Sequence, residues 1–202
     1  MEAILVTEII EKALQDSYTY EEYKKLVGNL LNEGKSTGTN QTDDLLNYSL
    51  LNDRRMKRWD KTVKLESHII DKVSEAVLNV TWLVITEGWC GDAAHALPVL
   101  NRIAELNKGI DLKLVLRDDH EELMQLFLTN GSKSIPKLII YDNHKREVLH
   151  TWGPRPSEAT KLVNDYKAEH GSLNPVFKQE LQMWYNKNKG KNIAEDISEL
   201  IL

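Results

Sequence analysis

Apolar residues recur every three or four positions over the first 79 residues, and short continuous apolar runs replace this pattern from residue 80 onward. Helical spacing predicts amphipathic helices, whereas a short β-branched run predicts a buried strand. The helical stripes consist of Ile9, Ile10, Ala13 and Leu14; Tyr23, Leu26, Val27, Leu30 and Leu31; Leu45, Leu46 and Leu50; and Ile69, Ile70, Val73, Ala76 and Val77. The first part of the chain is therefore predicted to be helical.

Polar residues mark where these helices begin. Thr19 precedes Glu22 by three positions, which is the spacing of a capping box. Thr42 or Asp43 is placed to cap the third helix. Between the second and third stripes, residues 34–42 read GKSTGTNQT, a composition that predicts a mobile loop.

The second part of the chain alternates strands and helices. We predict strands at residues 80–86, 112–117, 137–142 and 147–152, and helices at 93–107, at 118–131, from Ser157 and after Asn174. A strand, a helix and a second strand in succession form a parallel pair. The fold class is therefore α/β, with a mixed sheet flanked by helices and further helices at the C-terminal end.

Composition restricts the function. The chain has 202 residues, 41% of them apolar, and a net charge of −5. This acidic balance gives no basic footprint for nucleic acid, and no apolar run reaches the roughly 18 residues of a membrane span. The first residues carry acids within an apolar stretch and no basic segment, so we expect no secretory signal and a cytoplasmic location.

The single cysteine lies in the sharpest local motif. Because Cys90 is the single cysteine, neither an internal disulfide nor a cysteine zinc cage can form. Trp89, Cys90, Gly91 and Asp92 stand between a predicted buried strand and a helix start. The free N–H groups at a helix start stabilise an anion, which would favour a reactive thiolate. A second feature is the Ile135-Pro136 pair at the start of a strand, where an X-Pro bond can be cis.

Together these features resemble the thioredoxin superfamily, whose members place a W-C-x-x-C motif after a strand and a cis-proline facing it. Trp89 to Ala93 would correspond to the motif, and Ser134-Ile135-Pro136 to the cis-proline segment; Gly153 falls near a glycine that many thioredoxins keep. The resemblance implies a thioredoxin-like domain at 80–170. It leaves the rest of the chain unexplained, which we expect to form a helical N-terminal extension at 1–79 packed on that domain and a helical C-terminal extension at 171–202.

Departures from the family pattern decide what chemistry the motif can support. Ala93 takes the place of the resolving cysteine, Val84 that of the buried acid on the preceding strand, and Asp92 that of the motif proline. An ordinary dithiol thioredoxin is therefore excluded.

Three interpretations of Cys90 stay open. In the first, Cys90 is a nucleophile that works through a mixed disulfide or sulfenic acid resolved by an external thiol. In the second, the cis-proline face binds an extended peptide or partner protein without redox chemistry. In the third, Cys90 is merely packed. The first interpretation would make the protein a monothiol thiol-disulfide oxidoreductase. Its partners would be protein thiols or disulfides, or glutathione acting as a co-substrate.

The residues beside Cys90 have assigned roles in this hypothesis. Trp89, Gly91, Asp92, Ile135 and Pro136 would shape the site. The helix start lowers the pKa of the thiol and the Asp92 charge raises it by a comparable amount, so a lowered Cys90 pKa is a hypothesis.

Glu87 and His95 are two further titratable residues near the motif. Glu87 is a candidate proton relay, but we interpret it as an exposed loop acid. The spacing of Cys90 and His95 on a helix separates them, so no metal or cofactor is expected and His95 is interpreted as solvent-exposed. A homo-oligomer stays open because the tail ends in the apolar pair Ile201-Leu202.

The run from Arg54 to Arg58 is the only basic cluster in the sequence. It could dock an anionic group such as the glutathione carboxylates. Because Asp53 and Asp60 flank it, we interpret it as a solvated helix face.

Overall fold

The computed structural model describes residues 2–201 as helices packed on both faces of one sheet. The helices are α1 (Glu2–Gln15), α2 (Tyr20–Asn32), α3 (Asp43–Thr62), α4 (Ser67–Glu75), α5 (Gly91–Ala104), α6 (Glu121–Leu126), α7 (Ser157–His170), α8 (Pro175–Asn188) and α9 (Lys191–Glu199). The strands are β1 (Val80–Thr86), β2 (Ile110–Leu116), β3 (Lys137–Asp142) and β4 (Glu147–Trp152).

The sheet has the order β2-β1-β3-β4 and is mixed, as predicted. β1 pairs in parallel with β2 and antiparallel with β3, so Val84 lies between Leu114 and Leu138. Every residue of β1 is buried, which explains its unbroken apolar run. The carboxyl end of this central strand leads directly into the cysteine motif.

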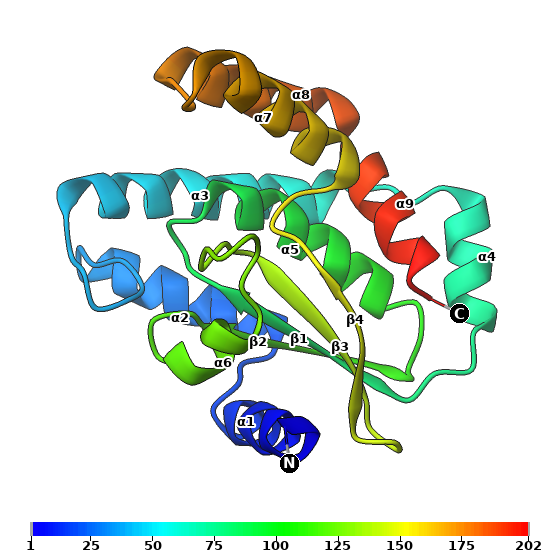
Figure 1. Cartoon of the computed structure of the whole chain (residues 1–202). Helices are drawn as coiled ribbons and strands as arrows, with labels where there is room; N and C mark the ends of the chain where they lie inside the picture. Colours follow the sequence, from blue (N-terminus) through cyan, green and yellow to red (C-terminus); the bar gives the residue numbers. More distant parts are fainter. Residues whose placement is uncertain (1, 202) are drawn as a thin grey trace.

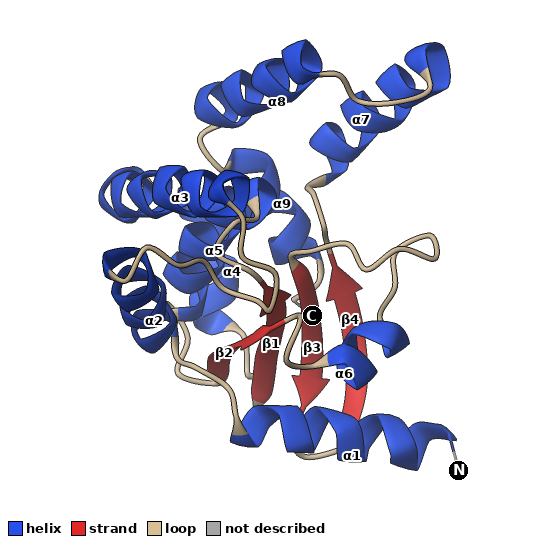
Figure 2. Cartoon of the chain, turned by 90° about the vertical axis from the view of Figure 1, so that its left-hand side faces the viewer, coloured by secondary structure: helices blue, strands red, loops and turns tan. Residues whose placement is uncertain are grey.

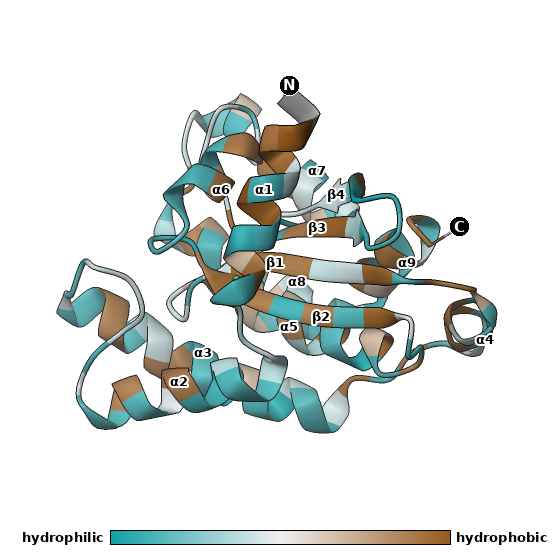
Figure 3. Cartoon of the chain, turned by 90° about the horizontal axis from the view of Figure 1, so that it is seen from below, coloured by the Kyte–Doolittle hydropathy of each residue, from teal (hydrophilic) through white to brown (hydrophobic). Residues whose placement is uncertain are grey.

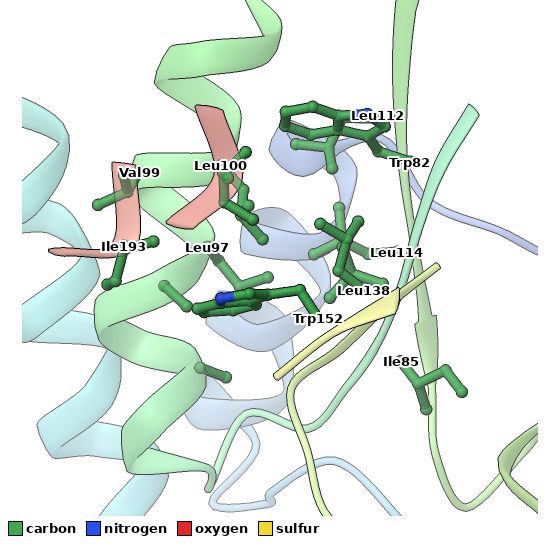
Figure 4. Packing of buried hydrophobic residues seen from close by; sticks show 14 of the residues in the cluster. Trp82, Ile85, Leu97, Val99, Leu100, Leu112, Leu114, Leu138, Trp152 and Ile193 are labelled. Atoms are coloured by element: carbon green, nitrogen blue, oxygen red, sulfur yellow. The ribbon is translucent and has the colours of Figure 1, made fainter. Parts of the chain in front are cut away.

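Helices cover both faces of the sheet (Figures 1 and 2). In Figure 1, α5, α3 and α9 lie above the sheet and α1 and α6 below it, while α7 and α8 form an outer layer over α3. Figure 3 shows α1 crossing the hydrophobic strands from below. The main core lies between α5 and the sheet: Figure 4 shows Leu97 and Leu100 directed from α5 toward Trp152 and Leu114, with Ile193 of α9 beside the same helix.

The predicted helix starts are confirmed. Thr19 and Glu22 form a reciprocal capping box at α2, with the Thr19 N–H donating to Glu22 Oε2 at 2.8 Å. Thr42 Oγ1 accepts from the Leu45 N–H at 3.2 Å and caps α3.

The predicted helix at 118–131 is wrong in length, because α6 covers only Glu121–Leu126. Thr129 and Ser132 form an antiparallel bridge around Asn130 and Gly131, whose φ values are +50° and +74°. Two successive positive φ values are those of a tight hairpin turn, for which Asn-Gly is the favoured pair. The Asn-Gly pair therefore forms a turn at the end of this segment, whereas the prediction continues the helix to Gly131 as its stop signal.

Other boundaries also differ from prediction, two of them at the starts of elements. β2 begins at Ile110, where the prediction begins at 112, and α5 begins at Gly91, where the prediction begins at 93. The earlier start of α5 matters for the site, because it makes Cys90 the residue that caps the helix.

The last helix completes the start of α7. Pro156 at the α7 N-cap carries no capping side chain, and Asp196 of α9 accepts instead from the Ser157 N–H at 2.7 Å and from the Trp152 indole at 3.1 Å. Ile201 is buried, and Leu202 lies outside the described residues. Within residues 2–201, no helix is long and apolar enough to span a membrane.

Candidate functional site

Cys90 joins the end of β1 to the start of α5. It is the N-cap of α5, and its sulfur accepts from the Ala93 N–H at 3.5 Å. The thiol in turn donates to the Ile135 carbonyl oxygen at 3.2 Å. Only 8% of Cys90 is exposed, so the sulfur lies between a helix start and the segment before Pro136.

The cis-proline segment is present where it was predicted. The Ile135–Pro136 peptide bond is cis, as is the Gly153–Pro154 bond. Gly153 has a φ of +107°, and a Cβ there would lie 2.2 Å from the Pro136 carbonyl oxygen. Glycine is therefore the one residue that lets the chain pass this close behind the proline.

Burial reverses the hypothesis of a lowered Cys90 pKa. Desolvation of the sulfur, followed by the nearby Asp92 charge, raises the pKa of the thiol to about 12. The Ala93 N–H and the Arg155 charge act in the opposite direction but do not compensate. The sequence identified the helix start and the Asp92 charge, and it missed both Arg155 and the burial, which is the largest effect.

Asp92 is held by residues far away in the sequence. Arg155 Nη2 lies 2.7 Å from Asp92 Oδ2, and the Tyr185 hydroxyl of α8 donates to Asp92 Oδ1 at 2.9 Å. Burial raises the pKa of Asp92, while Arg155 and Tyr185 oppose the increase. Its carboxylate therefore binds partners outside α5 instead of capping that helix.

A hollow of about 310 Å³ opens at Cys90. Its lining consists of Trp89, Cys90, Gly91, Asp92, Arg117, Lys133, Ser134, Ile135, Pro154 and Arg155. The Arg117 guanidinium lies 4.7 Å from the centre of the Trp89 ring, and the same side chain pairs with Asp118 at 2.8 Å. The hollow thus combines a flat aromatic wall, cationic side chains and the cis-proline segment.

Glu87 is buried, so the interpretation as an exposed loop acid is wrong. Only 1% of the residue is exposed; Oε1 accepts from the Asp118 N–H at 3.0 Å, and Oε2 has no hydrogen-bond partner among the described residues. Burial raises the pKa of Glu87, and the Thr37 hydroxyl opposes the increase. Its hydrogen bond to Cys90 is through the backbone, the Cys90 N–H donating to the Glu87 carbonyl at 3.1 Å.

The loop at residues 34–42 is bound to the motif and does not project as a mobile loop. Thr37 is 2% exposed, and its Oγ1 accepts from the Gly88 N–H at 2.8 Å. Asn52 of α3 donates to the Gly88 carbonyl at 3.0 Å. Sequence reasoning missed this support, because nothing in the polar composition of the loop showed that two of its side chains are buried.

His95 is also buried, contrary to expectation. Its Nε2 lies 2.9 Å from Gln182 Oε1, its ring stacks on Tyr185 at 4.4 Å between centroids, and its Nδ1 has no hydrogen-bond partner among the described residues. Burial lowers the pKa of His95 to about 4. Within residues 2–201, no group of three or more His, Cys, Asp or Glu side chains could hold a metal ion.

The basic cluster is only partly a solvated face. Arg54 is exposed, and Lys57 pairs with Asp53 at 2.7 Å, as interpreted. Arg58 donates to Asn186 of α8. Arg55 is half-buried, so it does not belong to the solvated face.

Fold and motif together define a thioredoxin-fold protein with one cysteine. A family model described as "Thioredoxin" matches residues 38–167, which is more than half of the chain. The chain therefore belongs to this thioredoxin family. The match begins within the polar loop before α3, so it includes helices that the sequence resemblance left unexplained.

Solved structures share the fold at low sequence identity. An HIV epitope scaffold aligns with a TM-score of 0.57 and 15% identity, covering 91% of this chain and 98% of that chain. A protein of unknown function from Pseudomonas aeruginosa aligns with a TM-score of 0.55 and 15% identity, covering 91% and 97%. No curated protein matches the sequence.

Proposed function

We propose that this protein binds an extended segment of a partner protein at the cis-proline face, with Cys90 remaining a protonated thiol. The observation that carries this proposal is the state of the sulfur: it is buried, donates to the Ile135 carbonyl and has a raised pKa. With its pKa raised to about 12, the thiol stays protonated at neutral pH. Thiolate is the reactive form, so burial opposes redox use of Cys90.

The surface around the sulfur supports binding. The hollow of about 310 Å³ has Trp89 on one side and Ser134-Ile135 on another. Aromatic side chains provide large contact areas in protein interfaces. A half-buried tryptophan next to an irregular backbone segment suits a partner that presents main chain and one or two side chains.

Monothiol redox chemistry is the second candidate, and the position of Cys90 at the N-cap of α5 favours it. The Cys90 thiolate would attack one sulfur of a partner disulfide, breaking the S–S bond and releasing the other sulfur as a thiolate that takes up a proton. One glutathione thiolate would then displace the partner from Cys90, and a second would release Cys90 and leave glutathione disulfide. Two glutathione molecules would thereby reduce one partner disulfide.

Alkylation separates the two candidates. Because Cys90 is the single cysteine, iodoacetamide labelling followed by intact mass reports on it alone. We expect slow labelling of the folded protein, with a midpoint well above the roughly 8.5 of a free thiol, and rapid labelling after denaturation. Rapid labelling with a midpoint below that value would favour redox chemistry.

Binding itself is tested by selecting extended peptides from a displayed library on the immobilised protein. We expect selected peptides to retain affinity for Cys90→Ser and to lose about tenfold or more for Trp89→Ala, as for an aromatic residue at the centre of an interface. Trp184→Ala is the matched control, because Trp184 is also half-buried but does not line the hollow. Loss of binding in Cys90→Ser, or equal effects of the two tryptophan variants, would contradict the proposal.

A further inference from the structure

A cavity between α3 and α8 adjoins the motif on the side of Gly91. Its volume is about 600 Å³, within the range of small-molecule sites. Its lining consists of Leu45, Tyr48, Leu51, Arg55, Trp89, Gly91, Asp92, Arg155, Leu173, Pro175, Lys178, Gln179, Leu181 and Gln182. Figure 1 shows α8 lying over α3. We call this space the α3–α8 cavity.

Arg55 gives this cavity an uncompensated positive charge. Nη1 of Arg55 donates to the neutral Asn52 side chain at 3.0 Å, and no carboxylate of the described residues pairs with it. The one acid in the lining, Asp92, is already bound by Arg155 and Tyr185. A half-buried guanidinium without an anion is costly to desolvate, and a bound carboxylate would offset that cost.

Two N–H donors converge on an open space beside Gly91. A Cβ atom built on Gly91 would lie 3.7 Å from both Arg55 Nη1 and Gln182 Nε2. Gln182 uses its other amide atom, Oε1, toward His95. A small acceptor group placed in this space would therefore lie within reach of a charged and a neutral donor at once.

Apart from Lys178, Gln179 and the Asp92–Arg155 pair, the remaining lining is mostly apolar. Leu45 and Leu173 are half-buried, Leu181 is buried, and Tyr48 and Leu51 leave 53% and 42% of their surface exposed. An apolar wall with a cation and an amide at one end is complementary to a molecule with an apolar body and one anionic end.

We propose that the α3–α8 cavity binds a small amphipathic carboxylic acid, its apolar body along α3 and α8 and its carboxylate at Arg55 and Gln182. The cavity shares Trp89, Gly91, Asp92 and Arg155 with the hollow at Cys90, but carboxylate binding at Arg55 and Gln182 does not require the Cys90 sulfur. Its occupation would bring a ligand against Gly91, the first residue of α5.

Calorimetric titration of the full chain with decanoate, below the concentration at which it forms micelles, tests this site. We expect saturable binding at one site, and at least about tenfold weaker binding of decanol, which has the same chain without the charge. Arg55→Met should weaken decanoate binding about tenfold or more for the same reason. Arg54→Met is the matched control, because Arg54 is exposed on the same helix, and it should bind like the unmodified protein.

Leu51→Glu provides a second variant that does not depend on Arg55→Met folding, since Leu51 is 42% exposed. An added carboxylate in the lining should weaken decanoate more than decanol. The proposal is overturned if decanoate and decanol bind equally, if folded Arg55→Met binds decanoate as well as Arg54→Met does, if Leu51→Glu weakens the two probes equally, or if no saturable binding occurs. These outcomes are independent of peptide capture at Cys90, so failure here leaves the proposed function untouched.

Discussion

Arg155 Nη2 lies 2.7 Å from Asp92 Oδ2, so the acid two residues after the cysteine is paired with a side chain from the segment before α7. This pair acts on Cys90 from both sides, because the Asp92 charge raises the pKa of the thiol and the Arg155 charge lowers it. Asp92 is nearer to Cys90 in the sequence, and its charge changes the pKa of the thiol more than the Arg155 charge does.

Asp92→Asn should therefore lower the pKa of Cys90. Removing a like charge at roughly 6 Å is worth about 0.5–2 pH units, and alkylation at pH 8 should become about tenfold faster. The pH profile of iodoacetamide labelling measures the change. Asp111→Asn, an exposed acid on β2, is the control and should leave the profile unchanged. An unchanged midpoint in Asp92→Asn would show that burial alone holds the thiol protonated.

Glu87→Gln should stabilise the protein at neutral pH. Burial raises the pKa of Glu87 above its ordinary 4.5, so its contribution to stability is fully present below 4.5 and is lost as the pH rises through the raised pKa. The glutamine carries no charge and keeps an acceptor for the Asp118 N–H. Urea unfolding at several pH values should show the advantage of Glu87→Gln growing with pH, and no such growth for the exposed control Glu8→Gln.

His95 should make the protein sensitive to acid. Its pKa is lowered from 6.5 to about 4, so the stability of the folded state is intact above 6.5 and falls as the pH decreases toward 4. The total loss is of the order of 3 kcal/mol. Urea unfolding at pH 7.5 and pH 4.5 should show a smaller loss in His95→Gln than in the unmodified protein. An equal loss in His95→Gln and in the exposed control His144→Gln would assign the acid sensitivity to other groups.

Thr37→Val should loosen the motif loop. The substitution keeps the shape of the side chain but leaves the buried Gly88 N–H without its acceptor, at a cost of about 1–3 kcal/mol in the free energy of unfolding. Chemical denaturation measures this cost, and Thr39→Val, exposed in the same loop, should change it little. Equal stability of the two variants would mean that the loop contributes nothing to holding the motif.

Asp196→Ala should destabilise the join between α9 and α7. Its carboxylate accepts from the Ser157 backbone, the Ser157 hydroxyl and the Trp152 indole, and its loss should cost about 1–3 kcal/mol. Denaturation followed by tryptophan fluorescence measures the change. Glu195→Ala removes an exposed neighbouring acid and should have little effect; if both variants behave alike, the cap is not significant.

Local signals in the sequence predict most of the fold. β1 is a continuous apolar run because both of its faces are covered, and the α2 start is a capping box that two residues, Thr19 and Glu22, determine. The sequence does not predict where α6 ends, because Gly131 fits equally well as a helix stop and as the second residue of an Asn-Gly turn. Only the pairing of Thr129 with Ser132 distinguishes the two.

The site is less predictable because its electrostatics depend on distant contacts. Cys90, Trp89 and Pro136 could be identified from motif and order alone. Glu87 is buried next to Gly88, whose N–H the loop residue Thr37 accepts from, and Asp92 is bound by Arg155 and Tyr185. Residues brought together over such separations leave no periodic pattern in the sequence.

The Tyr185 hydroxyl that donates to Asp92 belongs to a residue 93 positions later in the chain. Synthesis proceeds from the N-terminus, so a ribosome-bound chain that has released β1 and α5 carries Cys90 and Asp92 before either Arg155 or Tyr185 exists. During that interval Asp92 has neither of these partners, and until residue 135 is made the sulfur lacks the Ile135 carbonyl to which it donates. The electrostatic surroundings of Cys90 are therefore complete only after the segment before α7 and then α8 have been made.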